Sequence, residues 1–155
     1  MLEVGCGAPD FETALDDGTP FRLSDLRGQK NVVLYFYPSD FSIGCTAQAC
    51  SFHDSYDQVQ RHDAIILGVS RDSQERHASF REKHGLKFSL ISDPRGAIAE
   101  LYDVKSSIPK IRPRVTYIID KQGVIRSVFR HDLAIGRHLR DTLEALQELQ
   151  GAGAA

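Results

Sequence analysis

The sequence NVVLYFYPSDFSIGCTAQACSFHDS, residues 31–55, is the part around which the rest of the chain is organised. Its apolar run Val32–Tyr37 predicts a buried strand, and Pro38 breaks this strand because it has no N–H to donate. A short polar loop follows, and Cys45 stands where a helix can begin. The stretch therefore predicts a strand that delivers one thiol to the first turn of a helix.

The predicted place of Cys45 has a chemical consequence. The first turn of a helix carries unpaired N–H groups and a partial positive charge, and both favour an anion. A thiol in such a place ionises more readily than a free thiol, whose pKa is about 8.5, and the thiolate is the nucleophile of sulfur chemistry. We expect Cys45 to be reactive and Cys50 to offer a second thiol on the same helix, over about residues 42–60.

The composition limits the class of protein. A chain of 155 residues can bury one substantial core, and we expect a single domain over residues 1–150 with a disordered tail over 151–155. The net charge is -2 and the 19 basic residues are scattered, which argues against a nucleic-acid partner. No apolar segment approaches the roughly 20 residues of a membrane span, so no membrane is expected either.

The cysteines indicate the redox environment. Cys6, Cys45 and Cys50 are too few for a disulfide-rich secreted scaffold, and two thiols separated by four residues constrain almost nothing. They fit catalytic or redox thiols in a reducing compartment. We expect the cytoplasm or, after removal of a targeting peptide, an organelle.

The order of the other predicted elements indicates the fold class. An N-terminal hairpin is expected around Asp16-Asp17-Gly18, and strands at residues 64–70 and 87–91 alternate with helices that end near residues 84 and 102. Two strands at residues 115–120 and 124–130 then form a hairpin, and a leucine-rich helix closes the chain. This is an α/β chain with a thioredoxin-like fold: a central mixed sheet, helices on both faces and an N-terminal hairpin.

Several segments resemble the peroxiredoxin family, in particular its bacterioferritin comigratory protein or Q-type subfamily. The resemblance lies in YFYP at residues 35–38, Ser42, GCT at 44–46, ACSF at 49–52, APDF at 8–11, LSDLRG at 23–28 and RVTYIID at 114–120. It implies a thiol-dependent peroxidase that reduces hydrogen peroxide and organic hydroperoxides. It also implies recycling by thioredoxin or a similar dithiol protein, without a cofactor or metal, in a monomer or weak dimer.

The resemblance implies a role for individual residues. The family pattern Pro-x-x-x-Thr/Ser-x-x-Cys falls on Pro38, Ser42 and Cys45, and the family arginine falls on Arg114. Cys45 would attack the peroxide, Arg114 and Ser42 would orient it, and Pro38 would shape the pocket. Many relatives have Pro and Glu where this chain has Ile43 and Gln48.

Cys50 is the candidate that resolves a sulfenic acid on Cys45 into a disulfide. Residues five apart on a helix are separated by about 140° and roughly 7.5 Å, beyond normal disulfide geometry. We therefore expect the helix around Cys50 to unwind locally in each turnover.

Other interpretations remain open from the sequence. A thiol-disulfide oxidoreductase is the alternative enzyme, although its usual C-x-x-C spacing differs from that of Cys45 and Cys50, and a non-enzymatic redox sensor or binding module is another. Cys6 fits a packing role, and Arg112 is an alternative to Arg114. The histidines match no strong zinc pattern, and we expect the following four to be solvated: His53, His77, His84 and His138.

Overall fold

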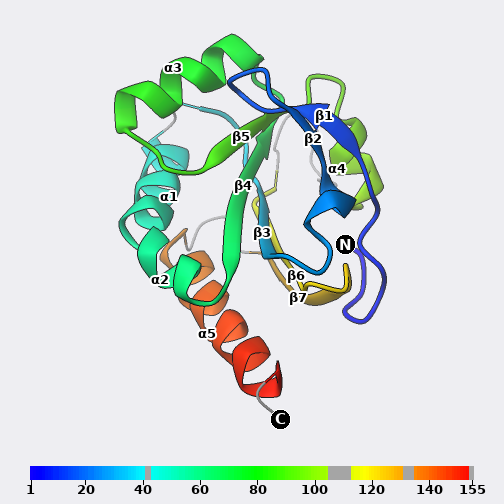
Figure 1. The fold of residues 1–155 in the computed structure, drawn as a ribbon. Helices are drawn as coiled ribbons and strands as arrows, with labels where there is room; N and C mark the ends of the chain where they lie inside the picture. The colour runs from blue at the N-terminus through cyan, green and yellow to red at the C-terminus, as the bar shows by residue number, and fades with distance from the viewer. Residues whose placement is uncertain (41–42, 105–112, 131–134, 154–155) are drawn as a thin grey trace.

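The computed structural model describes residues 1–40, 43–104, 113–130 and 135–153, and a mixed sheet lies at its centre (Figure 1). Its strands are β3 (Asn31–Phe36), β4 (Ala64–Ser70), β5 (Ser89–Ser92), β6 (Val115–Ile119) and β7 (Ile125–Arg130). They lie side by side in the order β5-β4-β3-β6-β7. β3 is parallel to β4 and antiparallel to β6, β4 is parallel to β5, and β6 is antiparallel to β7. The predicted mixed sheet is confirmed, with the strand before Cys45 in the middle.

Two cores lie on the two faces of this sheet, because successive side chains of a strand point to opposite faces. Val33, Tyr35 and the following Tyr37 face one core, and Val32, Leu34 and Phe36 face the other. Figure 1 shows α1, α2 and α5 on one face of the sheet and α4 on the other. The helices are α1 (Ile43–Asp54), α2 (Tyr56–Arg61), α3 (Gln74–His84), α4 (Ala97–Leu101) and α5 (Ile135–Gly153).

The N-terminal hairpin is present as predicted. Strands β1 (Glu12–Ala14) and β2 (Pro20–Arg22) pair antiparallel, and the short 3-10 helix η1 (Leu23–Leu26) follows. The turn between them uses Gly18 at φ 86°, a left-handed conformation that glycine adopts without steric cost. A bridge between Leu15 and Ile91 places the hairpin beside β5, an edge of the sheet.

The predicted reactive helix is two helices. α1 ends at Asp54 and α2 begins at Tyr56, with Ser55 between them, whereas the sequence predicted one helix over about residues 42–60. α3 ends at His84, as predicted, and the chain leaves it at Gly85 with φ 59°. The Ser73 hydroxyl caps the start of α3 by accepting from the Arg76 N–H. Because Ser55 separates α1 from α2, the crossover from β3 to β4 consists of two helices instead of one.

The closing helix α5 continues to Gly153, beyond Gln150, where we expected a disordered tail to begin. Its leucines pack on the α1 face of the sheet: Leu146 is fully buried, and Leu139, Leu143 and Leu149 are partly buried. Residues 154 and 155 lie outside the described part of the chain. Across the described residues, no helix combines the length and apolar character that a bilayer crossing requires.

Candidate active site

The loop that enters α1 begins where the sheet pairing of β3 ends. The Tyr37 N–H still donates to the Val69 carbonyl at 3.0 Å, one residue beyond β3. Pro38 follows, half-buried, and has no N–H with which to continue the ladder. It lies at the boundary that the sequence predicted, while Ser42, the other residue expected in this loop, lies outside the described residues.

Cys45 is the third residue of α1 and is almost completely buried, with 1% of its surface exposed. It belongs to the core that contains Tyr35, Tyr37 and Phe52. The first turn of α1 has N–H groups without partners in the helix ladder, and α1 carries no acidic residue in that turn. The thiol therefore lies at the positive end of a helix inside an apolar environment, as the sequence predicted for its helix position.

Arg114 comes to the same helix from the distant strand β6. Because Val115 pairs with Phe36, Arg114 lies one residue beyond that pair, level with the loop that leaves β3. Its side chain is buried, and Nη1 donates to Oε1 of Gln48 at 2.9 Å. Gln48 is three residues after Cys45, and residues at that spacing share a helix face. The fold therefore brings Arg114 to the Cys45 side of α1.

Gln48 contributes a second polar group to this site. Arginine has donors only, so Gln48 must present its oxygen to Arg114 and point its amide nitrogen elsewhere. That nitrogen, Nε2, is buried and has no hydrogen-bond partner among the described residues, and a buried donor without a partner costs roughly 1–3 kcal/mol. The site thus contains an unused N–H donor next to the guanidinium.

Tyr35 reports on the charges in this core. Burial raises the pKa of Tyr35 well above its ordinary value of 10.0, and the charges of Asp40, Cys45 and Cys50 raise it further. Arg114 acts in the opposite direction on the same hydroxyl. Both thiols and the guanidinium therefore lie within electrostatic reach of one buried ring.

Cys50 lies on the same helix as Cys45 in a different environment. It is half-buried, and its Sγ lies 4.0 Å from Nδ1 of His84 in α3. Both cysteines are free thiols, and both belong to the uninterrupted helix α1. On such a helix the two sulfurs point about 140° apart, so joining them requires α1 to open.

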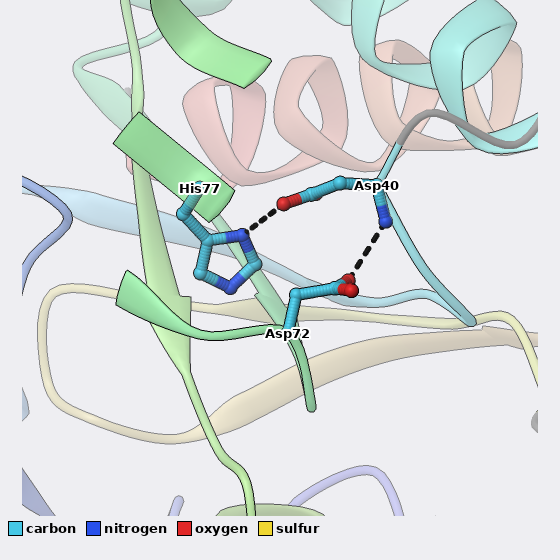
Figure 2. A group of neighbouring side chains, drawn as sticks. All are labelled: Asp40, Asp72 and His77. Atoms are coloured by element: carbon cyan, nitrogen blue, oxygen red, sulfur yellow. Dashed lines mark hydrogen bonds and ion pairs between the residues drawn. The ribbon is translucent and has the colours of Figure 1, made fainter. Parts of the chain in front are cut away.

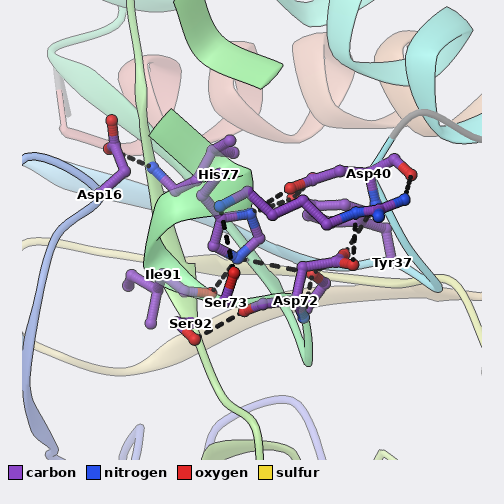
Figure 3. A network of polar contacts seen from close by, with 11 residues as sticks. Asp16, Tyr37, Asp40, Asp72, Ser73, His77, Ile91 and Ser92 are labelled. Carbon is purple, nitrogen blue, oxygen red and sulfur yellow. Dashed lines mark hydrogen bonds and ion pairs between the residues drawn. The ribbon is translucent and has the colours of Figure 1, made fainter. Parts of the chain in front are cut away.

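A buried polar network holds the loop before Cys45 (Figure 2, Figure 3). Nδ1 of His77 lies 2.6 Å from Oδ2 of Asp40, and both side chains are fully buried. The sequence prediction that His77 is solvated is therefore wrong. The sequence contained a signal for this buried position. His77 and Phe80 are three residues apart, and they are the buried residues of the mostly polar helix α3.

His138 was also expected to be solvated, and this expectation is wrong too. It is completely buried on α5, and its Nδ1 lies 2.8 Å from Oγ1 of Thr116 in β6. The inward face of α5 thus contains His138 and Thr142 as well as Leu146. The leucine pattern alone concealed these two polar positions.

One group of described residues has the side chains of a metal site. One ligand atom each from Asp40, Asp72 and His77 lie within 4.8 Å of one another. These atoms are already used in hydrogen bonds: Oδ2 of Asp72 accepts from the Asp40 N–H at 2.7 Å and from the Ser70 hydroxyl at 2.7 Å. Because the ligand atoms are turned toward protein donors, the arrangement is that of a hydrogen-bond network.

Comparison with known proteins gives the family of this chain. The AhpC/TSA family matches residues 4–128. Peroxiredoxin Bcp of Bacillus subtilis (strain 168) is 41% identical over 154 residues, which cover 96% of this chain and 97% of the relative. The chloroplastic Peroxiredoxin Q of Sedum lineare is 39% identical over 147 residues, which cover 94% of this chain and 78% of the relative.

Solved structures give the same result. Peroxidoxin BcpB from Mycobacterium tuberculosis superposes with a TM-score of 0.88 at 30% identity, over 96% of this chain and 98% of that one. The Xanthomonas campestris bacterioferritin comigratory protein, whose structures concern its alkyl peroxide reduction activity, gives 0.83 at 28% identity, over 96% and 97%. The predicted thioredoxin-like fold is confirmed. The chain belongs to the AhpC/TSA family and, within it, to the Bcp and Q-type peroxiredoxins.

Proposed function

We propose that this peroxiredoxin, a thiol-dependent peroxidase by family, reduces hydrogen peroxide and organic hydroperoxides through Cys45. The observation that carries the proposal is the hydrogen bond from Arg114 to Gln48, which joins the guanidinium to the helix face of Cys45. Alkyl peroxide reduction by the Xanthomonas campestris relative supports the substrate class. The three groups named here come from α1 and from the edge of β6, so only the folded chain assembles them.

In the first step the Cys45 thiolate attacks one peroxide oxygen in line with the O–O bond. The S–O bond forms, the O–O bond breaks, and the second oxygen leaves as an alcohol or water after taking up a proton. Arg114 stabilises the charge that develops on the oxygens, because a guanidinium is always charged and presents several fixed donors. We assign Ser42 to orienting the peroxide and Pro38 to shaping the pocket.

In the second step Cys50 resolves the sulfenic acid on Cys45. The Cys50 thiolate attacks that sulfur, the S–S bond forms, the S–O bond breaks, and the sulfenic oxygen leaves as hydroxide, which takes up the proton released by the Cys50 thiol and becomes water. His84 is placed to take the Cys50 proton, since its Nδ1 lies 4.0 Å from Sγ. The half-exposed position of Cys50 supports this role, because a segment near the surface opens at lower cost than one in the core.

A dithiol protein of the thioredoxin type then reduces the disulfide and restores both thiols. We propose that the enzyme works as a monomer or weak dimer without a prosthetic group. The relatives include a bacterial and a chloroplastic protein, so the cytoplasmic location stays a prediction.

Intact-mass analysis after one equivalent of hydrogen peroxide tests the two thiols. We expect the wild type to lose two hydrogen atoms, Cys45→Ser to stay unchanged, and Cys50→Ser to gain one oxygen atom. Oxidation of Cys45→Ser at the wild-type rate would remove Cys45 from the mechanism. Sustained turnover of Cys50→Ser at the wild-type rate would remove Cys50.

Turnover separates this function from the two alternatives that the sequence left open. A peroxidase consumes many equivalents of peroxide with a thioredoxin system, whereas a redox sensor reacts about once per molecule. A thiol-disulfide oxidoreductase would instead reduce the disulfides of insulin. We expect peroxide consumption and no insulin reduction.

A further inference from the structure

Asp40 lies in the loop that leads to Cys45 and is held by several polar contacts. It lies five residues before Cys45, and 1% of its surface is exposed. Its backbone N–H, backbone carbonyl and both carboxylate oxygens all have partners (Figure 3). The partners are Asp72 Oδ2 at 2.7 Å, Arg76 Nη2 at 3.2 Å, the Tyr37 hydroxyl at 2.5 Å and His77 Nδ1 at 2.6 Å.

His77 connects this loop to β5, an edge strand of the sheet. Its Nε2 lies 3.0 Å from the carbonyl oxygen of Ile91 in β5. A carbonyl only accepts, so Nε2 must carry a proton and donate it. Nδ1 and the Asp40 carboxylate then share one further proton across 2.6 Å. Both nitrogens of His77 are therefore used in a bridge from β5 to the loop.

The other partners of Asp40 are held in place by contacts of their own. Burial raises the pKa of Tyr37 well above its ordinary value, and the neighbouring Tyr35 and Asp40 add to this effect, so its hydroxyl stays protonated and donates to Asp40. Asp72 is fixed in turn, because its carboxylate also accepts from the Ser70 hydroxyl at 2.7 Å and pairs with Arg76 Nε at 3.1 Å. The loop is thus attached to β4, α3 and β5 together.

We propose that the buried Asp40–His77 pair positions Cys45, by fixing the loop before α1 to β5 through the imidazole. The proposal rests on the peroxidatic role of Cys45. In-line attack on an O–O bond depends on the placement of the sulfur, and a misplacement of about 1 Å costs roughly 100-fold in rate. Neither residue touches the peroxide in this scheme, so both are positioning residues.

The pair has a second consequence for the catalytic cycle. Disulfide formation requires α1 to open between Cys45 and Cys50, as their spacing on one helix demands. Asp40 lies on the N-terminal side of this segment, and its partners Asp72, Arg76 and His77 are outside α1. The pair therefore keeps the start of α1 in place while the part that carries Cys50 moves.

The test compares two reactions of the same thiol in a Cys50→Ser background, which lets the sulfenic acid accumulate. Rapid quenching followed by mass spectrometry gives the rate of peroxide oxidation of Cys45, and iodoacetamide gives its rate of alkylation. Alkylation requires a thiolate but no alignment with an O–O bond. A fall in the peroxide rate without a fall in the alkylation rate therefore measures positioning, because a loss of stability alone exposes the buried thiol and speeds its alkylation without slowing its attack on peroxide.

Four variants are compared with a matched control. His77→Phe and Asp40→Ala break the pair, and Tyr37→Phe removes one anchor of Asp40 at little change in volume. Asp40→Asn keeps both hydrogen bonds, since its amide can donate to His77 Nδ1 and accept from Tyr37. The control is Arg81→Gln, which breaks a part-buried contact of α3, from Arg81 Nη1 to the Asp16 carboxylate at 3.1 and 3.2 Å.

We expect the peroxide rate to fall about 100-fold in His77→Phe and Asp40→Ala, with alkylation unchanged or faster. Asp40→Asn should lose less than about tenfold, because a neutral hydrogen bond replaces a charge-assisted one. Tyr37→Phe should fall between these values, and it tests the proposal if the pair-breaking variants do not fold. Arg81→Gln should keep the peroxide rate of the parent protein.

Two results would overturn the proposal. One is a parent-like peroxide rate in the folded variants of Asp40, His77 and Tyr37, and the other is an Asp40→Asn protein as slow as Asp40→Ala. A parent protein whose Cys45 does not react with peroxide at all would instead contradict the proposed function. The failures of the two proposals are thus distinguishable.

Discussion

The two ends of the central strand β3 are held by charged groups of opposite character. At its amino end Asp63 lies between Lys30 Nζ, at 2.7 Å from Oδ1, and Lys121, and the Asp63 side chain is 45% exposed. At its carboxyl end Asp40 pairs with His77, and both side chains are 0% exposed. Both acidic residues belong to the crossover that joins β3 to β4.

The difference lies in what each end has to do. An exposed ion pair is worth about 0–1 kcal/mol, because water screens it and the long side chains lose entropy. A buried charge must have every lone pair satisfied, and removing one partner costs about 3–5 kcal/mol. The buried Asp40–His77 pair lies at the end of β3 that is near Cys45 and Arg114. The exposed ion pairs of Asp63 lie at the opposite end of β3, away from these two residues.

Arg114 provides the largest test of this contrast. We expect Arg114→Gln to lower the rate of Cys45 oxidation about 100- to 1,000-fold, because a preorganised donor to the developing charge is lost. Arg114→Lys should recover only part of this loss, since an ammonium lacks the planar fork of donors. Quenched-flow mass spectrometry of the Cys50→Ser protein measures both rates.

The matched control is an arginine at the opposite end of the sheet. Arg126 Nε pairs with Asp120 Oδ2 at 2.5 Å, and its side chain is 49% exposed. Arg126→Gln should oxidise at the parent rate. A comparable slowing in the two variants would show that the carboxyl end of β3 has no special role.

The elements that the sequence predicted correctly are those with a local signal. The apolar run before Pro38, the turn at Gly18 and the helix end near residue 84 each depend on a few neighbouring residues, and all three are present. Arg114 was found through the family resemblance, and its arrival next to Gln48 depends on the antiparallel pairing of β6 with β3. The break at Ser55 also had a local signal, since a serine followed three residues later by Gln58 is a pattern of helix starts, and the prediction of one helix over about residues 42–60 overlooked it.

The polar network at Asp40 could not be predicted from local patterns. Its partners Asp72, Arg76 and His77 lie 32, 36 and 37 residues along the chain. On α3 the many charged residues hid the inward position of His77, and a histidine between Arg76 and Ala78 resembles a solvated one. Only the packing of α3 on the sheet turns this side chain toward the loop.

Gln48 tests whether the carboxyl end also controls the opening of α1. Gln48→Glu replaces the neutral acceptor of the Arg114 guanidinium with an ionised one, so that the hydrogen bond becomes an ion pair and is stronger. Because α1 must open to form the disulfide, we expect disulfide formation to slow by up to about tenfold, equivalent to about 1.4 kcal/mol. The oxidation of Cys45 should change less than this second step.

The measurement is the time course of the sulfenic acid and disulfide masses after one equivalent of peroxide. Gln48→Leu is the matched control, since it removes the contact with Arg114 at similar volume and should accelerate the opening. Faster disulfide formation in Gln48→Glu than in the wild type would contradict this view of α1.

Asp63 gives the smallest effect and defines the other side of the comparison. The hydrogen bonds from Lys121 and Lys30 lower the pKa of Asp63 from 3.8 to about 2. The folded state therefore gains stability above pH 3.8, and this gain is lost as the pH falls toward 2. Asp63→Asn preserves the left-handed backbone at φ 55°, which asparagine tolerates, and removes only the charge.

We expect Asp63→Asn to lower the free energy of unfolding by less than about 1 kcal/mol at pH 7 and to leave the rate of Cys45 oxidation unchanged. Urea unfolding at pH 7 and at pH 3 should show the difference narrowing as the carboxylate of the wild type becomes protonated. Added salt should narrow it in the same way, because the pair is exposed. If Asp63→Asn slowed the oxidation of Cys45 as much as His77→Phe, exposure would not distinguish the two ends of β3. The contrast between them would then have another cause.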